Sequence, residues 1–251
     1  MITYAKLGRM GRFANGIFQI AGTIGVATKK GYDFSFPYWM NHDHKGQFGS
    51  TEDIDVQKWF VNPLPLCDDP DRFPERWVHW GFHGFDLPDN HSLCGHFQAP
   101  RYFSHCMDLI KHYFRMKDEP EQNDYCAIHF RAGDYESDQA GYHPRCTKEY
   151  YLKAMAKFPQ QQKYIIFSDG LEEARQMFYG INCTFADGNY LEDFRLMKTC
   201  KDFIIANSSY SLMPAILGEH PDKKIICPSR WFGEIAGLSG NDCYPENSII
   251  I

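Results

Sequence analysis

The chain has 251 residues, of which 43% are hydrophobic, enough to build the core of one large or two small globular domains. Its formal net charge of −6 argues against a general nucleic-acid binder, although it does not exclude a local basic pocket for a nucleotide. The N-terminal segment lacks the pattern of a secretion signal and no apolar stretch is long enough to span a bilayer, so we expect no transmembrane segment and a cytoplasmic location. The nine cysteines include no Cys-x-x-Cys pair and indicate reduced thiols.

The first half of the chain predicts a β-α-β unit followed by irregular structure. Two lysines and Gly31 mark the end of its helix, whose apolar face repeats at helical spacing. In chain order we expect a strand at 2–7, a Gly/Arg-rich loop at 8–14, a helix at 15–30, a strand at 32–36, irregular structure at 38–90 with a short strand near 77–80, a strand at 92–97 and a helix at 100–116.

The polar run 117–124 is the best linker in the chain, and we expect a domain boundary between residues 119 and 120. Beyond it, strands and helices alternate, which is typical of a parallel, doubly wound α/β sheet. The expected elements are strand 125–130, helix 147–158, strand 163–168, helix 171–179, strand 182–186, helix 190–200, strand 202–205, helix 209–218 and strand 223–227. The sequence therefore predicts domains at 1–119 and 120–251, each Rossmann-like.

A cation and a carboxylate follow the first strand of the second half. That strand, Tyr125–Phe130, continues into Arg131, Gly133 and Asp134. Ligands of open α/β sheets bind beyond the carboxyl ends of the strands, where a guanidinium can hold a phosphate by two parallel hydrogen bonds. Gly133 permits a sharp turn, and Asp134 could orient Arg131 or contact the ligand. The alternative is a buried Arg–Asp pair that closes a loop.

Three further segments follow predicted strands. The loop 8–15 enters a helix whose N-terminus favours an anion, or it is an ordinary turn with Asn15 as N-cap; it has neither the dinucleotide nor the P-loop glycine pattern. Asp169 could accept hydrogen bonds from a base or a ribose, or cap a helix. The run Asn207–Ser209 could hold a phosphate, or cap the next helix. Together these groups suit a nucleoside diphosphate.

The motifs also resemble a known family. The matching blocks are Gly11 to Ala21, Gly95-His96-Phe97-Gln98, His129-Phe130-Arg131-Ala132-Gly133-Asp134, Phe167-Ser168-Asp169, and Asn207-Ser208-Ser209-Tyr210-Ser211 with Pro228 and Trp231. In order and spacing they resemble the α-1,2-fucosyltransferases of glycosyltransferase family 11 from about residue 7 to residue 233. The His-x-Arg-x-x-Asp block is shared with α-1,6- and protein O-fucosyltransferases.

The resemblance implies a GT-B-like pair of Rossmann-like domains, GDP-fucose as donor, a galactose-containing glycan as acceptor, no metal and inversion at the sugar carbon. The N-terminal domain would face the acceptor and the C-terminal domain would bind the GDP-sugar. Arg131 would hold the β-phosphate, and Asp134 would be catalytic, one of three candidate bases with Glu136 and Asp138. The remaining site residues are, in the nucleotide pocket, His129, Asp169, Asn207, Ser208 and Ser209, and from the other domain Gly11, Arg12 and Asn15.

The chain departs from the family pattern at several positions, and weaker signals remain. Ala132 replaces a second Arg and Gly170 a second acid, with further changes at Ala14 and at Leu212-Met213. Two other hypotheses therefore stay open: a nucleotide-sugar-binding module without transfer, and a fucosyltransferase of another linkage. The run 41–44, Asn-His-Asp-His, is more typical of a polar loop than of a metal site, and we expect no metal. The aromatic run 77–85 could stack on an acceptor sugar or pack in the core.

Overall fold

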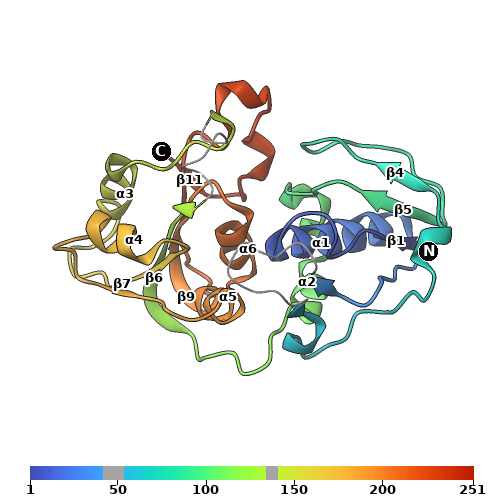
Figure 1. Cartoon of the computed structure of the whole chain (residues 1–251), viewed down its shortest axis with the longest axis horizontal. Helices are drawn as coiled ribbons and strands as arrows, with labels where there is room; N and C mark the ends of the chain where they lie inside the picture. The colour runs from blue at the N-terminus through green and yellow to red at the C-terminus, as the bar shows by residue number, and fades with distance from the viewer. Residues whose placement is uncertain (42–53, 134–140) are drawn as a thin grey trace. The chain divides into compact units, whose positions relative to one another are not determined.

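The computed structural model describes residues 1–41, 54–133 and 141–251, and divides the chain into two compact units (Figure 1). Unit 1 comprises Met1–Asp118 and unit 2 comprises Glu119–Ile251. The division falls one residue before the boundary that the polar linker predicts. Both units carry a parallel sheet, so the predicted α/β class with two parallel sheets is confirmed.

Unit 1 has a short parallel sheet. Its strands lie in the order β1 (Ile2–Thr3), β5 (His91–Cys94), β4 (Glu75–Trp77), and a separate antiparallel pair joins β2 (Met40–Asn41) to β3 (Ile54–Asp55). The predicted strand at 32–36 is wrong. Phe34 makes one bridge to β1 and Phe36 one bridge to Leu66, because β1 is only two residues long and the chain then turns to another partner.

The predicted helix at 100–116 is also wrong as one element. The chain instead forms 3₁₀ helices η3 (Pro100–Tyr102) and η4 (Ser104–Cys106) and then α2 (Met107–Tyr113). Phe103 (φ −133°, ψ 0°) and Cys106 (φ −129°, ψ 35°) leave the helical region, and this divides the segment. Two further 3₁₀ helices, η1 (Gln57–Trp59) and η2 (Pro70–Arg72), lie in the segment predicted to be irregular.

Helix α1 (Phe13–Lys30) is the core of unit 1. Fourteen of its residues between Phe13 and Ala27 are buried, as in a helix packed on all sides. It ends at Gly31, whose left-handed conformation (φ 71°) lets its N–H reach carbonyls of the last turn. Its N-cap is Arg12, so the alternative with Asn15 as N-cap is wrong and Asn15 lies in the first turn.

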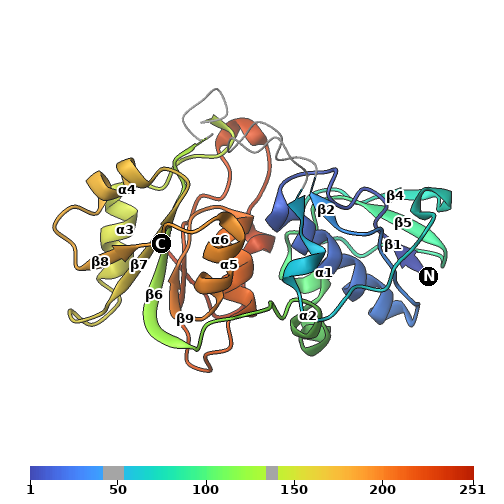
Figure 2. The ribbon, with the colours of Figure 1, turned by 60° about the horizontal axis from the view of Figure 1, so that its bottom comes forward.

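Unit 2 is a doubly wound sheet of six parallel strands in the order β11-β10-β9-β6-β7-β8. The strands are β6 (Asn123–Phe130), β7 (Tyr164–Ser168), β8 (Cys183–Phe185), β9 (Cys200–Ile204), β10 (Ile225–Cys227) and β11 (Ile249–Ile250), and the helices are α3 (Lys148–Met155), α4 (Leu171–Met177), α5 (Tyr190–Lys198) and α6 (Ser209–Leu217). Short 3₁₀ helices η7 (Glu234–Ala236) and η8 (Asn241–Cys243) precede β11. Chain order runs outward in both directions from β6 and β9, so the topological switch point lies between these two strands. Figure 2 shows α3 and α4 on one side of this sheet and α5 and α6 on the other.

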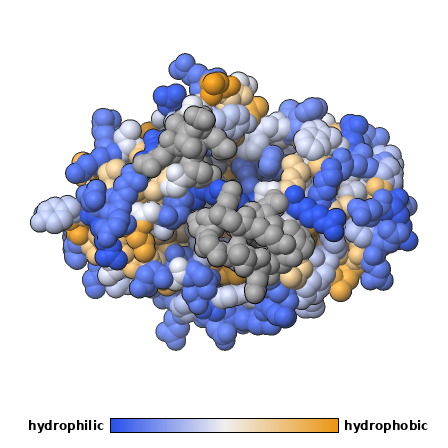
Figure 3. Space-filling view, in the orientation of Figure 1, coloured by the Kyte–Doolittle hydropathy of each residue, from blue (hydrophilic) through white to orange (hydrophobic). Residues whose placement is uncertain are grey.

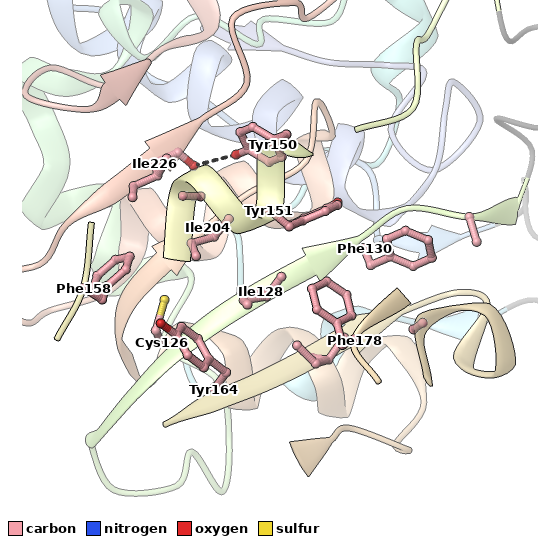
Figure 4. Close-up of a cluster of buried hydrophobic side chains, with 14 residues drawn as sticks. Cys126, Ile128, Phe130, Tyr150, Tyr151, Phe158, Tyr164, Phe178, Ile204 and Ile226 are labelled. Carbon is pink, nitrogen blue, oxygen red and sulfur yellow. Dashed lines mark hydrogen bonds between the residues drawn. The ribbon is translucent and has the colours of Figure 1, made fainter. Parts of the chain in front are cut away.

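Side chains of β6 alternate between the two faces of the sheet. Cys126, Ile128 and Phe130 pack with Tyr150 and Tyr151 of α3 in the core shown in Figure 4. His129, which lies between Ile128 and Phe130, faces α6 on the opposite side. Both faces of β6 are therefore packed, and residue 131 follows at the carboxyl end of this strand.

The described surface contains no sign of a membrane span. Within 1–41, 54–133 and 141–251, no helix is both long and apolar enough to cross a bilayer. The face in Figure 3 is mainly hydrophilic, with apolar residues in separate patches. All nine cysteines carry free thiols. The cytoplasmic location stays a prediction.

Candidate functional site

The end of β6 brings Arg131 against Asp169. Phe130 and Ser168 are partners in the β6–β7 register, so the next residue of each strand lies at the same edge of the sheet. There Nη1 of Arg131 forms an ion pair with Oδ2 of Asp169, and the two side chains are only 12% and 10% exposed. The backbone N–H of Ala132 donates to Oδ1 of Asp169 over 2.8 Å. Both carboxylate oxygens thus hold the chain that follows β6.

Gly133 completes this arrangement. Its φ is +23°, and a Cβ built on it would overlap Oδ2 of Asp169. Three consecutive residues therefore surround the Asp169 carboxylate. Arg131 contributes its side chain, Ala132 its backbone N–H, and Gly133 a Cα without a side chain. The structure thus contains the Arg–Asp ion pair that the sequence analysis gave as an alternative. The aspartate in this pair is Asp169, which directly follows the neighbouring strand β7. Asp134 lies outside the described residues, as do Glu136 and Asp138.

Asp169 does not cap α4. The N-cap residue of this helix is Gly170, and no side chain accepts a capping hydrogen bond there. A Cβ on Gly170 would lie 2.6 Å from the Cβ of Ala132, which is 3% exposed. The two departures from the family pattern therefore share one small space, directly beside the Arg131–Asp169 pair.

His129 lies beneath the site, in the layer between β6 and α6. It is 3% exposed, and its Nδ1 lies 3.0 Å from Oγ of Ser211. Burial, and to a smaller extent the charge of Arg131, lowers the pKa of His129 to about 3. The imidazole is thus neutral at ordinary pH. His129 thus connects the end of β6 to α6 through Ser211. A direct contact of His129 with a nucleotide stays a prediction.

The buried imidazole gives a stability prediction. An unfolded histidine binds a proton below its ordinary pKa of about 6.5, whereas folded His129 does not do so until about pH 3. Folding is therefore penalised as pH falls from 6.5 toward 3, by about 2 kcal/mol between pH 7 and pH 5. Urea unfolding at both pH values should show the smaller acid loss in His129→Gln, and equal losses in variant and wild type would contradict this assignment.

The end of β9 carries Asn207, Ser208 and Ser209, next to β6 in the sheet. Asn207 is 1% exposed, and its Nδ2 donates to the carbonyls of Pro144 and Trp231, each over 2.9 Å. It ties two loops to the strand exit. Oγ of Ser208 accepts from the N–H of Tyr210 and caps α6, as the cap alternative predicted, while Ser209 begins the helix.

In unit 1, a glycine-containing loop leads into α1. Gly11 has φ +78°, and a Cβ there would lie 2.5 Å from Nδ2 of Asn15, so this amide lies directly over the loop. Nε2 of Gln19 donates to the carbonyl of Met10 over 2.8 Å and fixes the loop to the helix. The structure therefore brings Gly11, Arg12 and Asn15 together at the start of α1.

Gln98 contacts a predicted site residue but was not itself predicted as one. Its Nε2 donates to Oδ1 of Asn15 over 2.6 Å. The signal was present in the block Gly95-His96-Phe97-Gln98, but only the folded chain joins that block to the start of α1.

The aromatic run 77–85 has both exposed and packed members. Trp77 is 50% exposed, whereas Phe82 packs against Tyr102 and the guanidinium of Arg101. Metal ligands do not gather in the described ranges, where no group of three or more His, Cys, Asp or Glu side chains is placed to hold an ion. Residues 42–44 of the weak histidine pattern lie outside the described residues.

Residues 89–231, more than half of the chain, match the family model of glycosyl transferase family 11. The chain belongs to glycosyl transferase family 11. Two relatives from Escherichia coli are an O-antigen biosynthesis glycosyltransferase, WbnK, 32% identical over 117 residues, and an alpha-1,2-colitosyltransferase, 28% identical over 178 residues. These matches cover 42% and 62% of this family 11 chain, and 38% and 61% of the relatives. The match thus spans less than two thirds of either relative.

Solved structures identify the fold of this family 11 chain. POFUT1 in complex with GDP superimposes with a TM-score of 0.56 over 99% of this chain and 97% of that chain, at 13% sequence identity. POFUT1 in complex with GDP-fucose gives a TM-score of 0.52 over 100% and 97%, at 12% identity. The GT-B-like α/β fold that the motifs predicted is therefore confirmed.

Proposed function

We propose that this chain is an inverting, metal-independent glycosyltransferase that moves fucose from GDP-fucose to a hydroxyl of a galactoside, forming an α-1,2 linkage. The observation that carries the proposal is the Arg131 guanidinium, held by Asp169 at the end of β6, beside the topological switch point of a doubly wound sheet. Membership of glycosyl transferase family 11 supports the reaction class, and the alpha-1,2-colitosyltransferase relative supports the α-1,2 linkage.

We assign the diphosphate to unit 2 because of the charge and the helix terminus at the end of its strands. The guanidinium of Arg131, which pairs with Asp169 through Nη1, has the planar fork of N–H donors that suits a phosphate. The N-terminus of α6, which follows the adjacent strand, adds the positive end of a helix dipole. In this proposal unit 2 binds the GDP-sugar, with Ser208 and Ser209 near the phosphates, and unit 1 faces the acceptor.

The reaction then depends on stabilising a leaving group. The acceptor hydroxyl oxygen attacks the anomeric carbon, the bond from that carbon to the β-phosphate oxygen breaks, and GDP leaves with its electron pair. Negative charge that grows on the β-phosphate meets the fixed charge of Arg131, so the site needs no reorganisation as the bond breaks. The acceptor proton passes to a base, for which Asp134, Glu136 and Asp138 stay candidates.

The test is an assay of GDP release. The chain is incubated with GDP-fucose, a panel of galactosides and EDTA, and the linkage of any product is determined by NMR. We expect turnover with at least one galactoside in the presence of EDTA. Absence of GDP binding would refute the whole proposal, whereas turnover only with another acceptor class would refute the galactoside.

The same assay separates the two other hypotheses. A binding module without transfer predicts GDP affinity that survives Arg131→Ala and no turnover by the parent chain. A transferase of another linkage predicts turnover with a product that is not 1,2-linked. GDP-colitose belongs in the donor panel because of the named relative.

A further inference from the structure

His129 is held from both faces of the unit 2 sheet. On the α3 side, the hydroxyl of Tyr151 donates to the carbonyl of His129 over 2.9 Å. On the α6 side, the centroid of the His129 ring lies 5.4 Å from that of Tyr210, and Nδ1 lies 3.0 Å from Oγ of Ser211. Tyr210 and Ser211 both belong to the first turn of α6. The imidazole is therefore fixed in position and in orientation.

The two nitrogens of this ring have different surroundings. Burial and the charge of Arg131 oppose protonation, so the ring is neutral, with a proton on one nitrogen and a lone pair on the other. In the part of the chain that the structure describes, Nδ1 contacts Ser211, whereas Nε2 has no hydrogen-bond partner. His129 is only 3% exposed, and a buried polar atom without a partner is costly. A bound ligand would supply the partner that Nε2 lacks.

The hydroxyl of Ser211 decides which nitrogen carries the proton. Its Oγ also lies 3.3 Å from the carbonyl oxygen of Ser208, three residues earlier. If Nδ1–H donates to Oγ, the hydroxyl proton can still donate to the Ser208 carbonyl, and two hydrogen bonds form. If the hydroxyl donates to Nδ1 instead, its bond to Ser208 is lost and only one hydrogen bond remains. The network therefore favours the tautomer with the proton on Nδ1 and the lone pair on Nε2.

We infer that Ser211 is a positioning residue that holds His129 as the Nδ1–H tautomer, so that the Nε2 lone pair accepts a hydrogen bond from a hydroxyl of the GDP-sugar. This role rests on the proposed function, which assigns the sugar donor to unit 2. Ionised phosphate oxygens have no proton to donate to Nε2, whereas ribose and fucose both carry hydroxyl donors. Arg131 and His129 thus recognise different parts of the donor, the first an anion and the second a neutral hydroxyl.

The tautomer can be measured by NMR. Proton–nitrogen correlation spectra of the chain with isotope-labelled histidine distinguish a protonated ring nitrogen from one with a lone pair, and the His129 signals are those missing from His129→Phe. We expect the proton on Nδ1 in the wild-type chain. In Ser211→Ala we expect a changed ratio of the two tautomers, which a purely structural role of the hydroxyl would not produce. A proton on Nε2 in the wild-type chain would overturn the inference.

Binding of the sugar donor tests the consequence. Isothermal titration calorimetry with GDP-fucose compares wild type with His129→Phe, Ser211→Ala and His129→Phe/Ser211→Ala. We expect each single variant to weaken binding by about three- to tenfold, the contribution of one neutral hydrogen bond. Because Ser211 acts through His129, the double variant should match His129→Phe within about twofold.

Thr199→Val is the matched control. Thr199 is also a fully buried hydroxyl residue of unit 2, and its Oγ1 donates to the carbonyl of Leu196, again three residues earlier, over 2.8 Å. It precedes β9, at the opposite end of this strand from Ser208. Thr199→Val should bind GDP-fucose within about twofold of wild type.

Titrations with GDP and with 2′,3′-dideoxy-GDP identify the hydroxyl. A loss in His129→Phe that is seen with GDP-fucose and GDP but not with the dideoxy nucleotide assigns a ribose hydroxyl. A loss seen with GDP-fucose alone assigns a hydroxyl of fucose. A loss that persists with 2′,3′-dideoxy-GDP would assign the contact to the base or the phosphates and overturn the inference.

The proposed function and the role of Ser211 fail in different ways. A wild-type chain that binds neither GDP nor GDP-fucose refutes both. Wild-type binding, together with a His129→Phe variant that is folded by circular dichroism and binds within about twofold of wild type, refutes the role of Ser211 and His129 alone. Losses that multiply in the double variant would do the same, because they would show that Ser211 acts independently of His129.

Discussion

Arg131→Ala is expected to lower the rate of GDP release by about 10²–10³-fold, with the chain still folded. The loss follows because the guanidinium is the fixed positive charge that stabilises the departing diphosphate, and removal of one such group from other active sites has this magnitude. Arg131→Lys keeps the charge but not the planar fork, so we expect an intermediate loss. Steady-state kinetics under saturating acceptor, with kcat and KM separated, provide the measurement.

Arg175→Ala is the matched control for this substitution. Arg175 is an exposed arginine of the same unit that packs over the ring of Phe185. Its loss should change turnover by less than about twofold. If Arg131→Ala retained more than a tenth of wild-type kcat/KM, Arg131 would not be the group that stabilises the leaving diphosphate.

Asp169→Ala is expected to lower the free energy of unfolding by about 3–5 kcal/mol, because it leaves a buried guanidinium without its carboxylate. The N–H of Ala132 also loses its acceptor. Urea denaturation followed by circular dichroism measures the loss. The double variant Arg131→Ala/Asp169→Ala should lose less than the sum of the single variants, since it leaves no uncompensated charge.

Glu149→Ala is the control for that stability measurement. Glu149 pairs with Lys153 on the surface of α3, where the side chains are 73% and 65% exposed. Exposed pairs of this spacing contribute little to stability, so Glu149→Ala should unfold close to wild type. A loss of less than about 1 kcal/mol in Asp169→Ala would mean that the Arg131 charge finds compensation elsewhere, and the role assigned to Asp169 would be wrong.

The sequence predicts unit 2 well because each of its elements is marked locally. Apolar runs of strand length alternate there with amphipathic runs, and the alternation alone implies a parallel, doubly wound sheet. Unit 1 is different, because its strands are two to four residues long and its core is one helix buried on all sides. Short pairings such as Phe34 with Ile2 are fixed by tertiary contacts, which leave no periodic signal.

The candidate site was predicted as a set of residues but not as a set of contacts. Asp134 is close to Arg131 in sequence and is one candidate to orient it, whereas the pairing with Asp169 comes from the β6–β7 register. That pairing follows from strand order, which the sequence does not contain. The bond from Gln98 to Asn15 joins residues 83 positions apart, so no local sequence rule predicts it.

The contact between Gly170 and Ala132 makes the residue allowed at one position depend on the other. A methyl group at 170 would meet the methyl group of Ala132, so position 170 cannot be enlarged without moving the backbone beside Arg131. Engineering that adds a side chain at position 170 should therefore vary position 132 in the same library.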